Sequence, residues 1–180
     1  ILRPEPGAST TAARARALGL TPTITPLFEV QAVAWTPPPP GAFDGLLITS
    51  ANAVRHAGEG LRALCALPVH AVGEASAEAA RQQGLHVATV GAGSVEDLLR
   101  NLPSASRFLH LAGEHRRVTA EATQKVHPVT VYRSVALPPP PELLAADDAV
   151  VMVHSPRAGE RLAEPVPRRA GLSLVAISPA

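Results

Sequence analysis

Several features that mark whole classes of protein are scarce in this 180-residue sequence. Aromatic residues make up only 3% of the chain, so its core must be built from Ala, Leu and Val, which commonly fill the space between helices and a parallel sheet. The single cysteine, Cys65, excludes an internal disulfide and favours a reducing, cytoplasmic location. The seven histidines include no H-E-x-x-H spacing and no cysteine pair accompanies them, so we expect no metal site.

Charge of one sign and long apolar runs are missing as well. The formal net charge is +1, without the basic stripe that a nucleic-acid or membrane-surface partner requires. No apolar run approaches the length of a membrane span, and the N-terminus does not resemble a signal peptide. We therefore expect a small-molecule ligand, and neither a nucleic acid nor a membrane as partner.

Two proline runs and an internal repeat organise what is present. The runs are Pro37–Pro40 and Pro138–Pro141, and each precedes an acidic residue, an apolar strand, a serine and a helix. The repeat has a period of roughly 105 residues and extends over more than one element, which indicates two related lobes. The repeated segments are DGLLITSANAV from Asp44 and DAVVMVHSPRAG from Asp148, then VHAVGEA from Val69 and LVAISPA from Leu174.

Short apolar runs alternate with helical patterns along the whole chain, which predicts the α/β class. We expect two similar parallel-sheet, flavodoxin-like lobes that arose by internal duplication and are joined by two antiparallel linkers. Residues 1–35 with 137–180 would form lobe 1, and residues 36–136 lobe 2; a sequential split is the alternative. The second copy stops about 25 residues before the first does, so the C-terminal part of lobe 1 is expected to be missing. The expected strands are 1–3, 23–30, 46–49, 69–72, 87–90, 108–111, 129–135, 150–153 and 174–177, and the expected helices are one capped by Ser9 or Thr10, then 54–64, 76–85, 94–102, 117–126 and 157–163.

Four turns between a strand and a helix carry small or polar residues. In an open α/β lobe such turns present backbone N–H groups to a ligand, anions in particular. Capping of the following helix explains any one of them alone, but four together indicate a ligand-binding edge. The turns lie at 49–52, 73–76, 112–114 and 154–156.

The only tyrosine, Tyr132, falls at the end of the last strand of the middle lobe. Its phenol could donate a proton, and a packed strand-edge ring is the alternative. Four arginines fall at or just past strand ends, where they could pair with carboxylates, although solvent exposure explains at least half of them. These are Arg3, Arg116, Arg117 and Arg157.

The remaining motifs do not indicate a binding or catalytic site. Gly91–Ser94 lacks the third glycine of a dinucleotide loop, and no G-x-S-x-G elbow is present. His70 and His110 lie inside apolar strands and are predicted core residues, as is Cys65 at a helix end.

The chain contains, in this order, the segments LRPEPG, ALGL, PLFEV, FDGLLITSANAV, VHAVGEAS, LAGEHRR, VTVYRSVA, VVMVHSPRAG and VAISPA. This ordered set resembles the uroporphyrinogen-III synthase family over the whole chain. The resemblance implies a lyase of heme and tetrapyrrole biosynthesis that closes linear hydroxymethylbilane with loss of water and inversion of ring D, without a cofactor. It also implies a cytoplasmic, monomeric enzyme, with transient contact to the enzyme that produces hydroxymethylbilane as a further expectation.

The same resemblance implies roles for individual residues. Tyr132 matches the family's VY segment and is the expected acid or water-orienting group, while Ser50 and Ser76 are expected to contact the substrate through their hydroxyls. A non-catalytic two-lobe protein that binds a small polyanion, or a degenerate relative kept for interaction only, are the alternatives. The full set of expected substrate-binding residues is Arg3, Ser50, Asn52, Gly73, Ser76, Gly113, Arg117 and Ser155.

Overall fold

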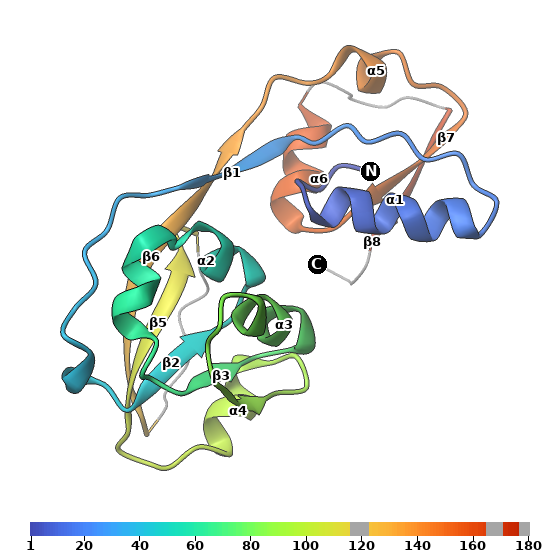
Figure 1. The fold of residues 1–180 in the computed structure, drawn as a ribbon. Helices are drawn as coiled ribbons and strands as arrows, with labels where there is room; N and C mark the ends of the chain where they lie inside the picture. The colour runs from blue at the N-terminus through green and yellow to red at the C-terminus, as the bar shows by residue number, and fades with distance from the viewer. Residues whose placement is uncertain (116–122, 165–170, 177–180) are drawn as a thin grey trace. The chain divides into compact units, whose positions relative to one another are not determined.

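The computed structural model describes residues 1–115, 123–164 and 171–176. The chain forms two compact units (Figure 1): unit 1 contains residues 1–30 and 135–180, and unit 2 contains residues 31–134. The helices and strands are α1 Gly7–Ala17, β1 Phe28–Ala32, the 3-10 helix η1 Pro40–Ala42, β2 Gly45–Ile48, α2 Ala51–His56, the 3-10 helix η2 Gly58–Leu64, β3 Val69–Ala71, α3 Glu74–Gln82, β4 Val87–Val90, α4 Val95–Arg100, β5 Arg107–Gly113, β6 Lys125–Ala136, α5 Pro141–Leu144, β7 Ala149–Val153, α6 Pro156–Ala163 and β8 Leu172–Ala176.

Unit 2 is built on a parallel sheet, which confirms the predicted α/β class. Within the described residues the strand order is β1-β6-β5-β2-β3-β4, and the pairs among β2 to β6 are parallel. Counted along the chain from β2, this order is 3-2-1-4-5, whereas a flavodoxin-like lobe has 2-1-3-4-5. The flavodoxin-like description is therefore wrong for unit 2 in chain order. In this sheet β2, the first strand of the series, is the central strand. The order would read 2-1-3-4-5 only if β5 and β6 were counted before β2.

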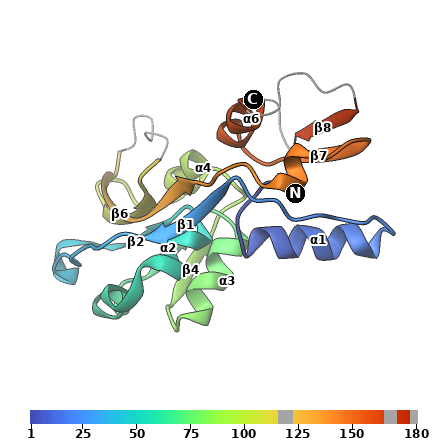
Figure 2. The same cartoon turned by 90° about the horizontal axis from the view of Figure 1, so that it is seen from above.

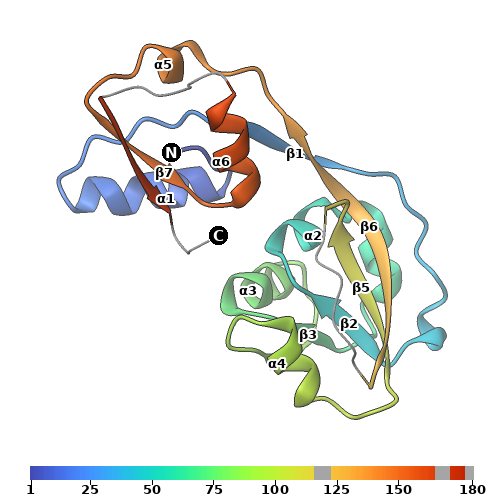
Figure 3. The same cartoon turned by 180° about the vertical axis from the view of Figure 1, so that it is seen from behind.

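Helices cover both faces of this sheet (Figure 3). Leu46 and Ile48 of β2 belong to the cluster that also contains α2 and α3, whereas Leu47 between them packs with Leu98 and Leu99 of α4. All three β2 side chains are fully buried. A parallel strand covered on both faces needs an unbroken apolar sequence, which explains why these strands were recognisable as continuous apolar runs.

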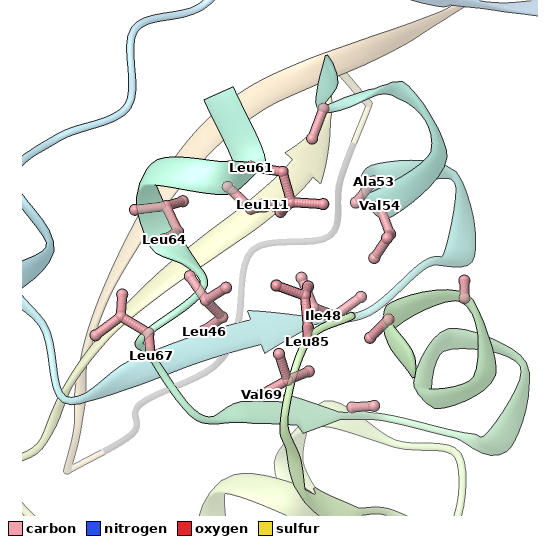
Figure 4. Packing of buried hydrophobic residues seen from close by; sticks show 14 of the residues in the cluster. Leu46, Ile48, Ala53, Val54, Leu61, Leu64, Leu67, Val69, Leu85 and Leu111 are labelled. Carbon is pink, nitrogen blue, oxygen red and sulfur yellow. The ribbon is translucent and has the colours of Figure 1, made fainter. Parts of the chain in front are cut away.

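The larger cluster of unit 2 is filled by aliphatic side chains from the sheet and from α2, η2 and α3 (Figure 4). Each fully buried leucine or valine stabilises the fold by about 1.5–3 kcal/mol relative to its exposed state. Leu61 and Leu64 of η2 are buried there as the helical spacing predicts, but the chain does not form one helix over 54–64. Gly58 has a φ of +62°, so α2 ends at His56 and a 3-10 helix follows.

Two further expectations for unit 2 are corrected. Cys65, predicted to be a core residue, is exposed, whereas Leu64 just before it takes the buried position at the end of η2. Strand β6 begins at Lys125, within the range expected for a helix, and Val126 packs against the α4 cluster. Residues 116–122 of that expected helix lie outside the described residues. The strand begins at Lys125 because this residue pairs in parallel with Arg107, the first residue of β5.

Unit 1 contains α1, α5, α6 and the paired strands β7 and β8 (Figure 2). Its core joins Leu2, Leu27 and Phe28 to Leu143, Val151 and Leu162 in one cluster that also contains Ala158. Residues 1–3 form no strand, although the Thr25 and Leu27 amides donate to the carbonyls of Ile1 and Leu2.

The helix expected after the first prolines begins at Gly7 rather than behind Ser9 or Thr10. Its exposed first turn is stabilised by the Glu5 carboxylate, which accepts hydrogen bonds from the Ser9 amide (3.0 Å) and hydroxyl (2.8 Å). The Glu5 carboxylate, rather than a serine or threonine cap, therefore satisfies a free amide of the first turn. The expected strand at 23–30 is found as β1, a few residues later.

The two repeated segments pair in matching register. Leu46 lies opposite Val69 in unit 2, and Val151, 105 residues after Leu46, lies opposite Leu174, 105 residues after Val69, in unit 1. Within the described residues, no helix is both long and apolar enough to cross a membrane.

Candidate functional site

The candidate site of unit 2 lies at the edge of the sheet where the parallel strands end and the helices begin. Ser50 caps α2, and its hydroxyl accepts a hydrogen bond from the Asn52 amide at 3.2 Å. Gly73 precedes α3 in an extended conformation, and a Cβ atom placed on it would meet no atom within 4 Å. Such turns direct free N–H groups towards a ligand at the sheet edge.

Ser76, in the first turn of α3, is only 6% exposed, and its amide donates to the Gly73 carbonyl at 3.0 Å. Ser50 and Asn52 are half-buried. Of the two expected hydroxyl contacts, Ser50 is therefore more accessible to a ligand than Ser76. The turn at Ser76 must adjust before its hydroxyl can reach a ligand.

Tyr132 stands beside the end of β5. It lies opposite Gly113 in the β5–β6 register, just past an irregularity between Ala112 and Gly113, and its carbonyl accepts from the Glu114 amide at 2.9 Å. A Cβ atom on Gly113 would lie 2.7 Å from Cζ of Tyr132 and 2.9 Å from its hydroxyl. The phenol therefore occupies the space that only a glycine at position 113 leaves free.

The tyrosine ring is held on one side and partly accessible. It packs against the main core cluster and is half-buried. Its centroid lies 6.4 Å from that of His56, with the two rings tilted by 38°. Within the described part of the chain, no hydrogen bond engages the phenol hydroxyl.

A buried hydrogen bond lies beneath the first turn. Thr49 Oγ1 is 2.9 Å from Nε2 of His110, which is 6% exposed. His110 and His70 both pair with Leu47 in register, so they share the face covered by α4, and the His70 ring contacts the Phe108 ring edge-on at 5.2 Å. Both histidines are confirmed as core residues, and burial lowers the pKa of His70 below its ordinary value.

His56 is the functional candidate that the sequence pattern did not reveal. It follows Asn52 by four residues, so both side chains lie on one face of α2. Burial, and then the charge of Arg55, lower the pKa of His56. The helical spacing from Asn52 was the available signal, but it carries no information about the distant Tyr132.

Unit 1 contains two of the expected residues. Ser155 caps α6, and its hydroxyl accepts from the Ala158 amide at 3.2 Å. The Arg3 side chain crosses Gly7 so closely that a Cβ there would lie 2.4 Å from its Nε. Burial, then the charge of Arg3, lower the pKa of the neighbouring His154.

The expected residues thus fall into two groups, one in each unit, and one further residue that the structure does not describe. Unit 2 brings Gly113 and Tyr132 into contact and places the remaining residues at the ends of neighbouring strands, whereas Arg3 and Ser155 belong to unit 1. Arg117 lies outside the described residues. Among the described residues, no group of three or more His, Cys, Asp or Glu side chains could hold a metal ion.

Comparison with known proteins decides the family. The family model described as uroporphyrinogen-III synthase HemD matches residues 9–180. The chain belongs to the uroporphyrinogen-III synthase family. The family expected from the ordered segments is therefore confirmed.

Two solved structures of uroporphyrinogen-III synthases share the fold. The enzyme from Helicobacter pylori is 16% identical, with a TM-score of 0.65 over 87% of this chain and 78% of that one. A mutant enzyme from Thermus thermophilus is 21% identical, with a TM-score of 0.57 over 98% of this chain and 84% of that one. No curated protein sequence matches the chain. At these identities the similarity concerns the fold, so the roles of individual side chains must be argued from their own chemistry.

Proposed function

We propose that this chain performs the reaction for which its family is named. Hydroxymethylbilane, a linear tetrapyrrole with many carboxylates, loses water and closes with inversion of ring D to give uroporphyrinogen III. The family match over residues 9–180 carries this conclusion. The reaction belongs to heme biosynthesis, and the enzyme is a lyase.

The two units are proposed to be duplicated lobes, with residues 1–35 and 137–180 in one and 36–136 in the other. The matching register of the Leu46–Val69 and Val151–Leu174 pairs supports a duplication. The proposal includes a cytoplasmic monomer that acts without a cofactor and transiently contacts the enzyme supplying its substrate.

Backbone amides would hold the substrate carboxylates. The turns at Ser50, Gly73 and Ser155 each precede a helix, where free N–H groups attract anions without added positive side chains. This arrangement suits a protein with a net charge of only +1. Arg3 and Arg117 would pair with further carboxylates.

Tyr132 is proposed to assist departure of the hydroxyl group. Protonation by a nearby acid lets the hydroxyl leave as water, which converts its pyrrole ring into an electron-poor azafulvene. The substituted carbon of ring D attacks this azafulvene, and the bridge bond already on that carbon then breaks and re-forms at the free position of ring D, which inverts the ring. The phenol is suited to this role because it is partly accessible at the sheet edge and has the space above Gly113. Since both reacting ends belong to one molecule, correct folding of the substrate supplies much of the selectivity.

The test compares wild type with Tyr132→Phe, which removes the hydroxyl but keeps the ring that packs against the core. Each protein is incubated with hydroxymethylbilane, and the type I and type III isomers are separated, because unassisted closure yields the uninverted type I. We expect wild type to form type III and the variant to form it about 10²-fold more slowly or worse. Type I alone from wild type would refute the assigned reaction, whereas an unaltered variant would remove Tyr132 from the mechanism.

A further inference from the structure

The contact between His56 and Tyr132 joins two elements of unit 2 that are far apart in sequence. His56 is the last residue of α2, and Tyr132 lies on β6 opposite Gly113, the last residue of β5. Their ring centroids are 6.4 Å apart with a tilt of 38°, within the range of an attractive aromatic pair. Gly113 is the other close neighbour of the phenol.

We infer that His56 is a positioning residue for Tyr132: its imidazole ring confines the phenol to the space above Gly113. Without the imidazole, the tyrosine side chain gains an alternative rotamer towards the vacated volume at the end of α2. A shift of about 1 Å in a reacting group can lower a rate by roughly 10²-fold. This inference depends on the proposed role of Tyr132.

The chemistry of His56 suits packing rather than proton transfer. Burial and the adjacent Arg55 lower its pKa, so the ring is uncharged at neutral pH and can lie against a phenol without a desolvated charge. No hydrogen bond connects His56 with Tyr132 among the described residues. A ring of similar size without polar atoms should therefore be able to take the place of the imidazole.

The experiment uses the whole chain and compares wild type, His56→Ala and His56→Phe. His86, which is exposed, provides the control variant His86→Ala. For His56→Ala we expect kcat for the type III isomer to fall about tenfold with little change in KM, and the share of type I to rise. His56→Phe should stay within about twofold of wild type, as should the control.

The same substitutions in a Tyr132→Phe background separate the proposals. If His56 acts through the phenol, adding His56→Ala there should lower the rate no further. An alanine variant equal to wild type, a phenylalanine variant as slow as alanine, or a further loss in the Tyr132→Phe background would each overturn the inference. Failure of wild type to form type III would instead refute the proposed function. The fluorescence of Trp35, which lies in unit 2, verifies that each variant is folded.

Discussion

The substitution Gly113→Ala tests whether the position of the Tyr132 phenol matters, and its effect can be worked out from the contacts. A Cβ at position 113 would lie 2.7 Å from Cζ, 2.8 Å from Cε2 and 2.9 Å from the hydroxyl of Tyr132. Non-bonded carbon atoms are most stable about 3.5–4.0 Å apart, so the ring must move away from β5 by about 1 Å. Gly113 does not have a positive φ, so alanine adds no backbone strain of its own.

The expected result is a large change in rate with a small change in stability. Displacing a reacting group by about 1 Å can lower a rate by roughly 10²-fold. Overpacking destabilises by about 1–3 kcal/mol, while loss of glycine flexibility in the unfolded chain offsets about 0.4–1 kcal/mol. The net loss of stability should therefore stay below about 3 kcal/mol, and the protein should remain folded.

The assay measures initial rates of type III formation and the type I share for wild type, Gly113→Ala and the control Gly41→Ala. A Cβ at Gly41 meets no atom within 4 Å, so that variant should behave as wild type. The double variant Gly113→Ala with Tyr132→Phe should be no slower than Tyr132→Phe alone. A wild-type rate in Gly113→Ala, or additive losses in the double variant, would refute the reasoning.

Two further predictions concern stability, measured by urea unfolding with Trp35 fluorescence. The Gln124 side-chain amide donates to the carbonyls of Leu99 (2.9 Å), Leu102 (3.0 Å) and Pro103 (3.3 Å). Gln124→Leu should therefore lower the free energy of unfolding of unit 2 by about 1–3 kcal/mol. An unchanged unfolding midpoint would contradict this prediction. Burial lowers the pKa of His70 below 6.5, so below that pH the unfolded chain binds a proton that the folded protein resists. Stability should therefore fall as pH drops below 6.5, by at most about 1.4 kcal/mol per pH unit from this group, and His70→Gln should reduce that slope; an equal slope would exclude His70 as its cause.

Much of unit 2 was predictable because its local signals are strong. The range 69–72 is found as β3 with one residue fewer, and its residues are all buried, as expected of a continuously apolar strand covered on both faces. The range 87–90 is found unchanged as β4, a strand at the end of the sheet order whose residues alternate between half-buried and exposed. Ser94 was expected to cap a helix, and its hydroxyl does accept from the Asp97 amide at 3.0 Å. The capping signal is local, so it survives without knowledge of the fold.

Two of the errors concern the backbone geometry of a segment. Lys125 and Val126 fit an amphipathic helix, but they extend β6 because β5 offers them parallel partners at Arg107 and Phe108. Likewise, the apolar spacing between Val54 and Leu64 was read correctly, yet Gly58 ends α2 and a 3-10 helix keeps Leu61 and Leu64 buried. The burial of Leu61 and Leu64 was predictable, but in both segments the backbone geometry was not.

The sequence by itself determined the family, the α/β class and the turns that cap the helices, because ordered motifs, apolar runs and capping residues are local properties of the chain. Only the tertiary structure decided that the phenol of Tyr132 lies above Gly113 and beside His56. That placement depends on the register of β6 against β5 after an irregularity at Ala112, and a shift of one residue would turn the ring to the opposite face of the sheet. No spacing along the chain encodes such a register, since it results from the packing of strands brought together by the whole fold.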